Sequence, residues 1–137
     1  MKCALELVAT ANFIAEQNAR EKALAEQRER EEMQARTIEL CEKLGSELEE
    51  KALRGQHPTI CFYCDKYSNR ILTSTYSDYA DGKLSHRCGK QIDLDLLKRW
   101  FEKYCFEVKT SNYDYRQYGW GWCSGSKIEI TPAPACL

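Results

Sequence analysis

Three cysteines and a histidine form the nearest approach to a metal-binding pattern in this sequence. Cys61 and Cys64 have Cys-x2-Cys spacing, and His86 and Cys88 follow as a second pair. Thiolates and imidazole suit tetrahedral zinc, and four protein ligands would make the site structural. However, the His-x-Cys spacing is uncommon, and a regular strand over residues 60–64 would point Cys61 and Cys64 to opposite faces. Two interpretations stay open, a structural zinc ion or buried thiols in a reducing compartment. We expect no other cofactor.

An aromatic and glycine-rich segment, residues 113–126, is the second candidate site. Tyr, Trp and Arg are enriched at the energetic centres of protein interfaces, and rings can also stack a nucleotide base. Three interpretations remain, namely a protein-docking surface, a nucleotide or nucleic-acid site, and rings that cover a small sheet and fill its core. The candidate contact residues are Tyr113, Tyr115, Arg116, Tyr118, Trp120 and Trp122.

No combination of residues predicts catalysis. Asp93 and Asp95 are better interpreted as the start of a helix, where carboxylates favour the positive end of the helix dipole. His57 lies beside Pro58 in a linker, and no glycine loop has phosphate-binding spacing. No base is evident beside any cysteine, so no nucleophilic thiol is indicated. We therefore expect a protein that is not an enzyme.

The elements that position these residues fall into two regions that differ in composition. All 8 tyrosines and all 3 tryptophans lie beyond residue 55. Residues 1–55 are rich in helix formers and contain no proline. The segment 26–32 is polar all round, as in a helix that bridges through solvent. We predict a helical spacer or oligomerisation region, 1–55, and a small α+β domain, 56–137.

Whether residues 1–54 form one helix or a helical hairpin is left open by the sequence. Gly45-Ser46 is a candidate interruption, since Ser46 with Glu49 has the capping-box pattern. Gly55 followed by Pro58 predicts the end of the helix.

The second region is predicted to be a small antiparallel sheet with one packed helix, which makes the chain α+β. Residues 59–63 and 71–76 resemble strands, and Asp81-Gly82 predicts a hairpin turn. Asp93 predicts a helix N-cap, with a staple between Ile92 and Leu97. Residues 105–110 and 127–131 alternate as strands do, and we expect them to pair across a long hairpin loop. The predicted buried face of the helix is Leu97, Trp100, Phe101 and Tyr104.

Charge and hydropathy limit the classes of partner. The formal net charge is −1, from 20 basic and 21 acidic side chains. A protein that binds nucleic acid through phosphate contacts is usually basic, at least locally.

Glu6 and Asn12 interrupt the early apolar residues, so we expect no signal peptide, no membrane span and a cytoplasmic protein.

The helix 94–104, the strand 105–109 and the run from Tyr113 to Ile130 resemble small accessory proteins from phages and prophages of gut Firmicutes. The chain is also similar in style to anti-defence proteins such as anti-CRISPRs. That resemblance implies a non-enzymatic inhibitor that blocks a host defence effector, such as a nuclease, by protein–protein contact. We expect it to be a homo-oligomer. The alternatives are a nucleotide-sequestering protein and a zinc-stabilised nucleic-acid binder.

Overall fold

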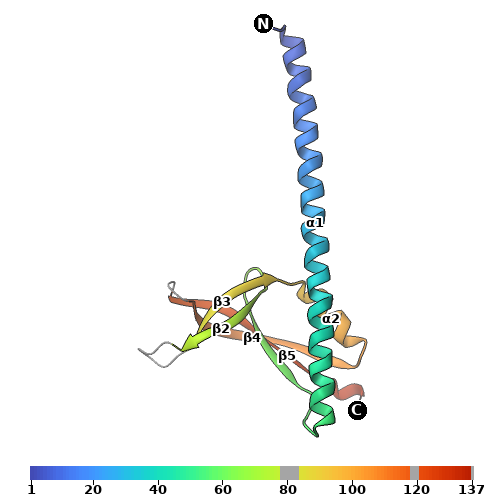
Figure 1. Ribbon diagram of the computed structural model, residues 1–137, viewed down its shortest axis with the longest axis vertical. Helices are drawn as coiled ribbons and strands as arrows, with labels where there is room; N and C mark the ends of the chain where they lie inside the picture. Colours follow the sequence, from blue (N-terminus) through green and yellow to red (C-terminus); the bar gives the residue numbers. More distant parts are fainter. Residues whose placement is uncertain (78–83, 118–120, 137) are drawn as a thin grey trace. The chain divides into compact units, whose positions relative to one another are not determined.

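The computed structural model describes residues 1–77, 84–117 and 121–136 of the chain. The chain divides into two compact units, Met1–Met33 and Gln34–Leu137. A single long helix, α1 (Ala4–Leu53), contributes to both units (Figure 1). The predicted long N-terminal helix is therefore present, and it is one helix rather than a hairpin.

The first unit consists of helix alone after its first three residues. A lone helix has no second element to cover its side chains, and residues 1–32 are all exposed. Its turns are reinforced by local contacts such as the hydrogen bond that Gln27 donates to Glu31, 3.2 Å long. Side chains four residues apart meet on a helix surface and stabilise it by about 0.2–0.5 kcal/mol per pair. Polar local contacts thus support this segment where no core exists.

The second unit combines strands with short helices. Its described elements after α1 are β1 (Ile60–Asp65), β2 (Arg70–Ser77), β3 (Leu84–Gln91), α2 (Leu94–Glu102), β4 (Phe106–Gln117), β5 (Gly121–Pro132) and the 3-10 turn η1 (Pro134–Cys136). The predicted α+β class, with a small sheet and one packed helix, is confirmed. The predicted hairpin between β2 and β3 also forms, and its turn residues Asp81 and Gly82 lie outside the described residues.

The five strands close into a barrel in the order β1-β2-β3-β4-β5. Neighbouring strands pair antiparallel except β3 and β4, which run parallel and pair at Ser85 with Arg116 and at His86 with Gln117. This short parallel pairing closes the sheet on itself. A closed sheet leaves no long edge of unpaired backbone groups exposed. The sequence did not predict the closure, because it depends on residues far apart along the chain.

The last third of α1 belongs to the core of the barrel unit (Figure 1). Thr37, Cys41, Leu44 and Leu48 recur at intervals of three and four residues and are buried. Cys41, Leu44 and Leu48 pack in one cluster with residues of β1, α2 and β5. The composition places a boundary at residue 55, whereas the compact unit begins at Gln34. The reason is that α1 supplies one wall of the apolar core.

Polar contacts fasten α1 to this unit as well. The guanidinium group of Arg36 donates two hydrogen bonds, of 3.3 and 3.1 Å, to the carbonyl oxygen of Gln91. The backbone N–H of Asp93 donates to the hydroxyl of the fully buried Thr37 at 2.8 Å. Near the end of α1, Lys51 donates to the carbonyl oxygen of Thr59 at 2.7 Å. These bonds fix the position of the last third of α1 along the barrel unit.

The predicted start of α2 is confirmed. Asp93 is the N-cap, and its side chain accepts a hydrogen bond of 3.1 Å from the backbone N–H of Leu96. Such a cap satisfies one of the amide groups that the first turn leaves without a partner. Leu97 and Phe101 are buried, as predicted, but Tyr104 is wrongly assigned to the buried face because it is 61% exposed. α2 ends at Glu102, so Tyr104 lies in the turn beyond it.

Helix α1 continues through Gly45 and Ser46, so the candidate interruption that the sequence left open does not occur. The hydroxyl of Ser46 donates to the carbonyl oxygen of Glu42 at 3.1 Å instead of capping a new helix. A Cβ atom at Gly45 would lie 3.3 Å from the ring of Trp100. The glycine therefore allows the indole to approach the helix backbone closely. The predicted helix end at Gly55 is confirmed by its left-handed φ of 74°.

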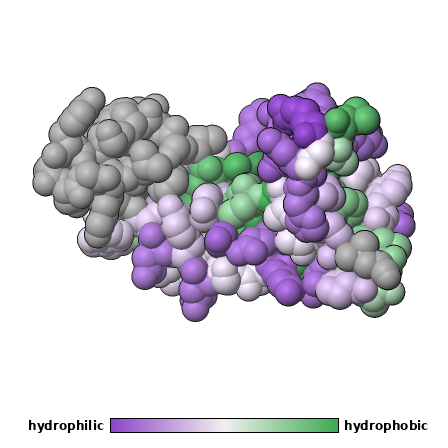
Figure 2. Space-filling view, turned by 90° about the horizontal axis from the view of Figure 1, so that it is seen from below, coloured by the Kyte–Doolittle hydropathy of each residue, from purple (hydrophilic) through white to green (hydrophobic). Residues whose placement is uncertain are grey.

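On the face shown in Figure 2, hydrophobic surface appears as limited patches between hydrophilic side chains. Among residues 1–77, 84–117 and 121–136, we find no helix with both the length and the apolar composition needed to cross a membrane.

Candidate functional site

The β4–β5 hairpin carries most of the aromatic segment. Its register is unbroken from Phe106 opposite Pro132 to Gln117 opposite Gly121. The predicted long loop is therefore wrong, because β4 ends at Gln117 and β5 begins at Gly121. Backbone pairing along the whole hairpin holds each of the described aromatic residues on a defined face.

The buried face of this hairpin changes along its length. Near the helices, Ile128 and Ile130 are fully buried on one face. Towards Gln117, the opposite face is inside, where Tyr115 is 4% exposed and Gly125 is buried. A Cβ atom at Gly125 would lie 2.8 Å from the carbonyl oxygen of Cys64 and 3.0 Å from the Tyr115 ring. Only glycine allows this close packing.

The structure separates the predicted contact residues into two groups. Tyr115 belongs to the core, so its assignment to a docking surface is wrong. Tyr113 is half-buried and packs between two other rings, 4.2 Å from Tyr63 and 6.3 Å from Tyr115 between centroids. The alternation along β4 places Tyr113 and Tyr115 on one face, and of these two rings only Tyr115 is buried. Part of the aromatic segment therefore fills the interior of the barrel.

Trp122 lies on the other face of the hairpin and is 58% exposed. It is opposite Arg116 in the register, and the structure describes Arg116 by its backbone alone. An open hollow of about 430 Å³ lies against Trp122, Cys123, Ser124 and Asp114. The remaining two candidates, at positions 118 and 120, lie outside the described residues. The exposed part of the predicted site is thus centred on Trp122.

The predicted zinc ligands are not all directed to one point. Cys61 is exposed, whereas Cys64 is fully buried on the opposite face of β1. Burial raises the pKa of the Cys64 thiol to about 12. The thiol of Cys88 lies 4.0 Å from the Tyr115 hydroxyl, and His86 is described by its backbone alone. Within the described part of the chain, no three Cys, His, Asp or Glu side chains form a metal cluster.

Three groups of this unit have pKa values above their ordinary values, namely Cys41, Tyr63 and Tyr115. Burial raises the pKa of the Cys41 thiol to about 11. Burial also raises the pKa of Tyr115, and the neighbouring Cys88 thiol raises it further. A hydrogen bond with the Cys61 thiol raises the pKa of Tyr63. The raised pKa keeps the Cys41 thiol in its neutral form at neutral pH.

Asp65 is a polar anchor that the sequence analysis did not identify. At the end of β1, its carboxylate accepts hydrogen bonds from the Ser68 backbone N–H at 3.0 Å and from the Ser68 hydroxyl at 2.7 Å. The backbone N–H of Arg70 also donates to it. Burial raises the pKa of Asp65, but these hydrogen bonds outweigh burial and lower the pKa overall. The carboxylate therefore holds the β1–β2 turn.

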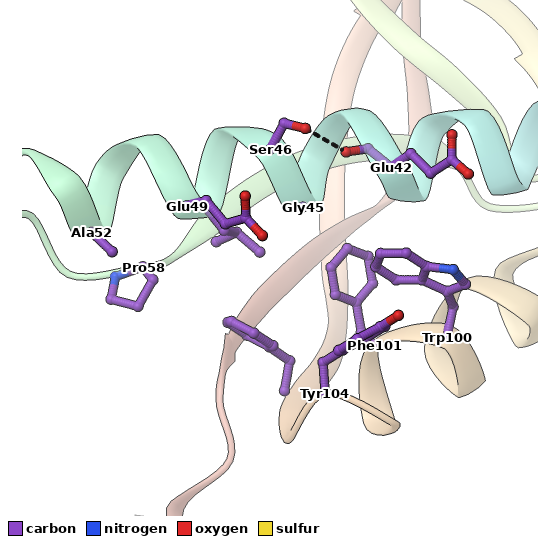
Figure 3. A pocket seen from close by; sticks show the side chains of 11 residues that line it. Glu42, Gly45, Ser46, Glu49, Ala52, Pro58, Trp100, Phe101 and Tyr104 are labelled. Carbon is purple, nitrogen blue, oxygen red and sulfur yellow. Dashed lines mark hydrogen bonds between the residues drawn. The ribbon is translucent and has the colours of Figure 1, made fainter.

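An apolar groove is the second feature that the sequence did not predict. It lies between the last third of α1 and α2 and has a volume of about 480 Å³ (Figure 3). In Figure 3 the rings of Trp100, Phe101 and Tyr104 point from α2 and its end toward Gly45 and Glu49 of α1. The groove lining also includes Phe106 from β4. The sequence shows the helical spacing of these residues, but it does not show that the two helices pack together to form the groove.

Comparison of the chain with protein-family models, with curated protein sequences and with solved structures gives no match.

Proposed function

We propose that this chain is a non-enzymatic binding protein that acts by protein–protein contact through the exposed surface around Trp122 on the β4–β5 hairpin. The observation that carries the proposal is the exposure of Trp122, 58%, on a paired two-stranded surface. A tryptophan held on a paired strand loses little conformational entropy on binding and buries a large area, so it is a strong contact residue. Steric blocking of a host defence effector is the specific mechanism that we propose, by analogy with phage anti-defence proteins.

The helical first unit supports an assembly role in this proposal. Leu5, Val8, Phe13, Ile14 and Leu24 are exposed hydrophobic side chains on α1. Burial of such side chains against another helix contributes about 25 cal/mol per Å² of apolar surface. We propose that residues 1–33 self-associate and so present several barrel units together, which raises the effective concentration of the docking face.

Nucleotide sequestration is the weaker alternative. Asp114 contributes a carboxylate to the hollow beside Trp122, and like charges repel phosphate at close range. A nucleotide stacked on Trp122 would therefore meet an unfavourable charge. A thermal-shift screen with mono- and cyclic nucleotides tests this alternative separately.

The test of the proposal is quantitative affinity capture from a bacterial lysate with mass spectrometry. Wild-type protein should retain a stoichiometric partner, and Trp122→Ala should lose at least nine-tenths of it, as expected for a hot-spot loss of about 2 kcal/mol. Tyr67→Ala is the matched control, because Tyr67 is 88% exposed and lies on the β1–β2 turn. Equal capture by both variants, with equal thermal stability, would refute the proposal.

A further inference from the structure

The groove between α1 and α2 combines aromatic walls with an acidic rim. Trp100 and Tyr104 form one wall, with ring centroids 4.9 Å apart. The full lining is Glu42, Gly45, Ser46, Leu48, Glu49, Ala52, Pro58, Trp100, Phe101, Tyr104 and Phe106. The only charged side chains in this set are the two glutamates, so the rim is uniformly negative.

The two carboxylates are available to a partner. Glu42 and Glu49 are both exposed, and among the described residues neither forms a salt bridge. Seven residues separate them, which on a helix is close to two full turns and about 10.5 Å. Both therefore lie on the same side of α1, and Figure 3 shows them beside the groove. Apolar walls with unpaired carboxylates fit a partner that carries both apolar and cationic groups.

We propose that this groove binds an amphipathic basic helix of another protein, with two Lys or Arg residues seven positions apart and an apolar side chain between them. The two bases would meet Glu42 and Glu49, while the apolar side chain inserts against Trp100 and Tyr104. Bases seven apart on a helix match the separation of the carboxylates, because the two helices share the same rise per residue. Cations over aromatic faces gain a further attraction.

The backbone chemistry of the groove favours a helix over an extended segment. The groove is formed between two helices, and the backbone groups inside a helix already bond to one another. The backbone of Phe106, on β4, is already paired with Pro132 of β5 in the sheet. An extended peptide would find few backbone partners there, whereas a helix satisfies its own N–H and C=O groups. Insertion of apolar anchors from one helix face is an established mode of recognition.

A second copy of this chain does not supply the required pattern from its first unit. The basic residues before Gln34 are Lys2, Arg20, Lys22, Arg28 and Arg30. None of these residues is seven positions from another, so no pair presents two cations on the same side at the required separation. The groove and the Trp122 face are formed by different residues, so this inference does not depend on the proposed function.

The test is a selection from a display library of random 18-residue peptides on the full-length protein. We expect enriched peptides to share two basic residues seven positions apart around an apolar residue, and to bind as helices by circular dichroism. The doubly charge-reversed variant, Glu42→Lys with Glu49→Lys, should bind these peptides at least tenfold more weakly. Peptides whose two bases are replaced by Glu should bind the charge-reversed variant more tightly than they bind the wild type.

Two further variants separate the groove from the rest of the surface. Tyr104→Ala should weaken peptide binding at least fivefold, whereas Tyr67→Ala and Trp122→Ala should leave it unchanged. The charge-reversed variant should keep the wild-type melting temperature within a few degrees, because both glutamates are exposed. Three results would each overturn the proposal. The first is that the enriched peptides lack the basic pair, and the second is that they bind the charge-reversed variant with equal affinity. The third is that the wild type enriches no peptides over that variant.

Discussion

Replacement of Leu44 by alanine should destabilise the barrel unit, although Leu44 lies in the long helix. Leu44 is 6% exposed and packs in the core cluster with α2 and the strands. Leucine-to-alanine changes in protein cores cost about 2–5 kcal/mol, from lost transfer energy and from the cavity that remains. Domains of this size are stabilised by only about 5–15 kcal/mol. The change should therefore remove a large part of the total free energy of unfolding.

Leu53→Ala is the matched control, since Leu53 lies in the same helix and is 88% exposed. Its effect should stay below about 0.5 kcal/mol, because the surface leucine contributes little and alanine is an excellent helix former. Urea unfolding followed by tryptophan fluorescence measures both variants. With a slope of about 1.5 kcal/mol per M, a loss of about 3 kcal/mol lowers the midpoint by about 2 M. Equal midpoints for the two variants would refute the assignment of α1 to the core.

Four further outcomes follow from the described contacts. Gly125→Ala should destabilise the fold by more than about 2 kcal/mol, because the added Cβ would lie 2.8 Å from the Cys64 carbonyl oxygen, and a wild-type melting temperature would contradict this packing. Asp93→Ala should lower the free energy of unfolding, measured in urea, by about 1 kcal/mol through loss of the α2 cap, whereas Asp93→Asn should retain most of the stabilisation that the cap gives. The lowered pKa of Asp65 means that its contribution is present above the ordinary value of 3.8 and is lost as the pH falls through the folded-state value. Asp65→Asn should therefore reduce the loss of stability in acid, and an unchanged pH profile would argue against this role. Finally, iodoacetamide at pH 8 should leave Cys41 and Cys64 unmodified in the folded protein while the exposed cysteines react, because burial raises the pKa values of these two thiols to about 11 and about 12.

The elements that the sequence predicted well depend on local signals. The helix end at Gly55 and the N-cap at Asp93 are set by neighbouring residues, so their patterns can be recognised directly. The antiparallel pairing of β4 with β5 likewise follows from two alternating runs close in sequence. Interactions between near neighbours determine the helix end and the N-cap.

The extent of the barrel unit could not be predicted in the same way. Cys41 and Leu48 have helical spacing, but spacing alone does not identify what covers them. Their cover comes from Ile60, Leu97 and Ile128, which are distant along the chain. The same limit applies to the closure between β3 and β4 and to the groove beside Gly45. Each depends on contacts that only the folded chain brings together.

The aromatic segment was predicted in part. Alternation correctly indicates that Tyr113 and Tyr115 share a face, but it does not indicate whether that face is inside. The hairpin also changes its buried face along its length, from Ile128 to Gly125, so no single pattern of alternation describes it. Tyr115 therefore belongs to the interior of the barrel, while Trp122 remains the exposed candidate for partner contact.

Site-specific photo-crosslinking from position 122 tests the proposed docking face most directly. Benzoylphenylalanine in place of Trp122 keeps an aromatic side chain there and forms a covalent bond to whatever lies against it. The same group in place of Tyr67, which is also exposed, is the control. We predict that position 122 yields one crosslinked partner in a bacterial lysate and that position 67 does not. Crosslinking at position 67 alone, or none at position 122, would contradict the account.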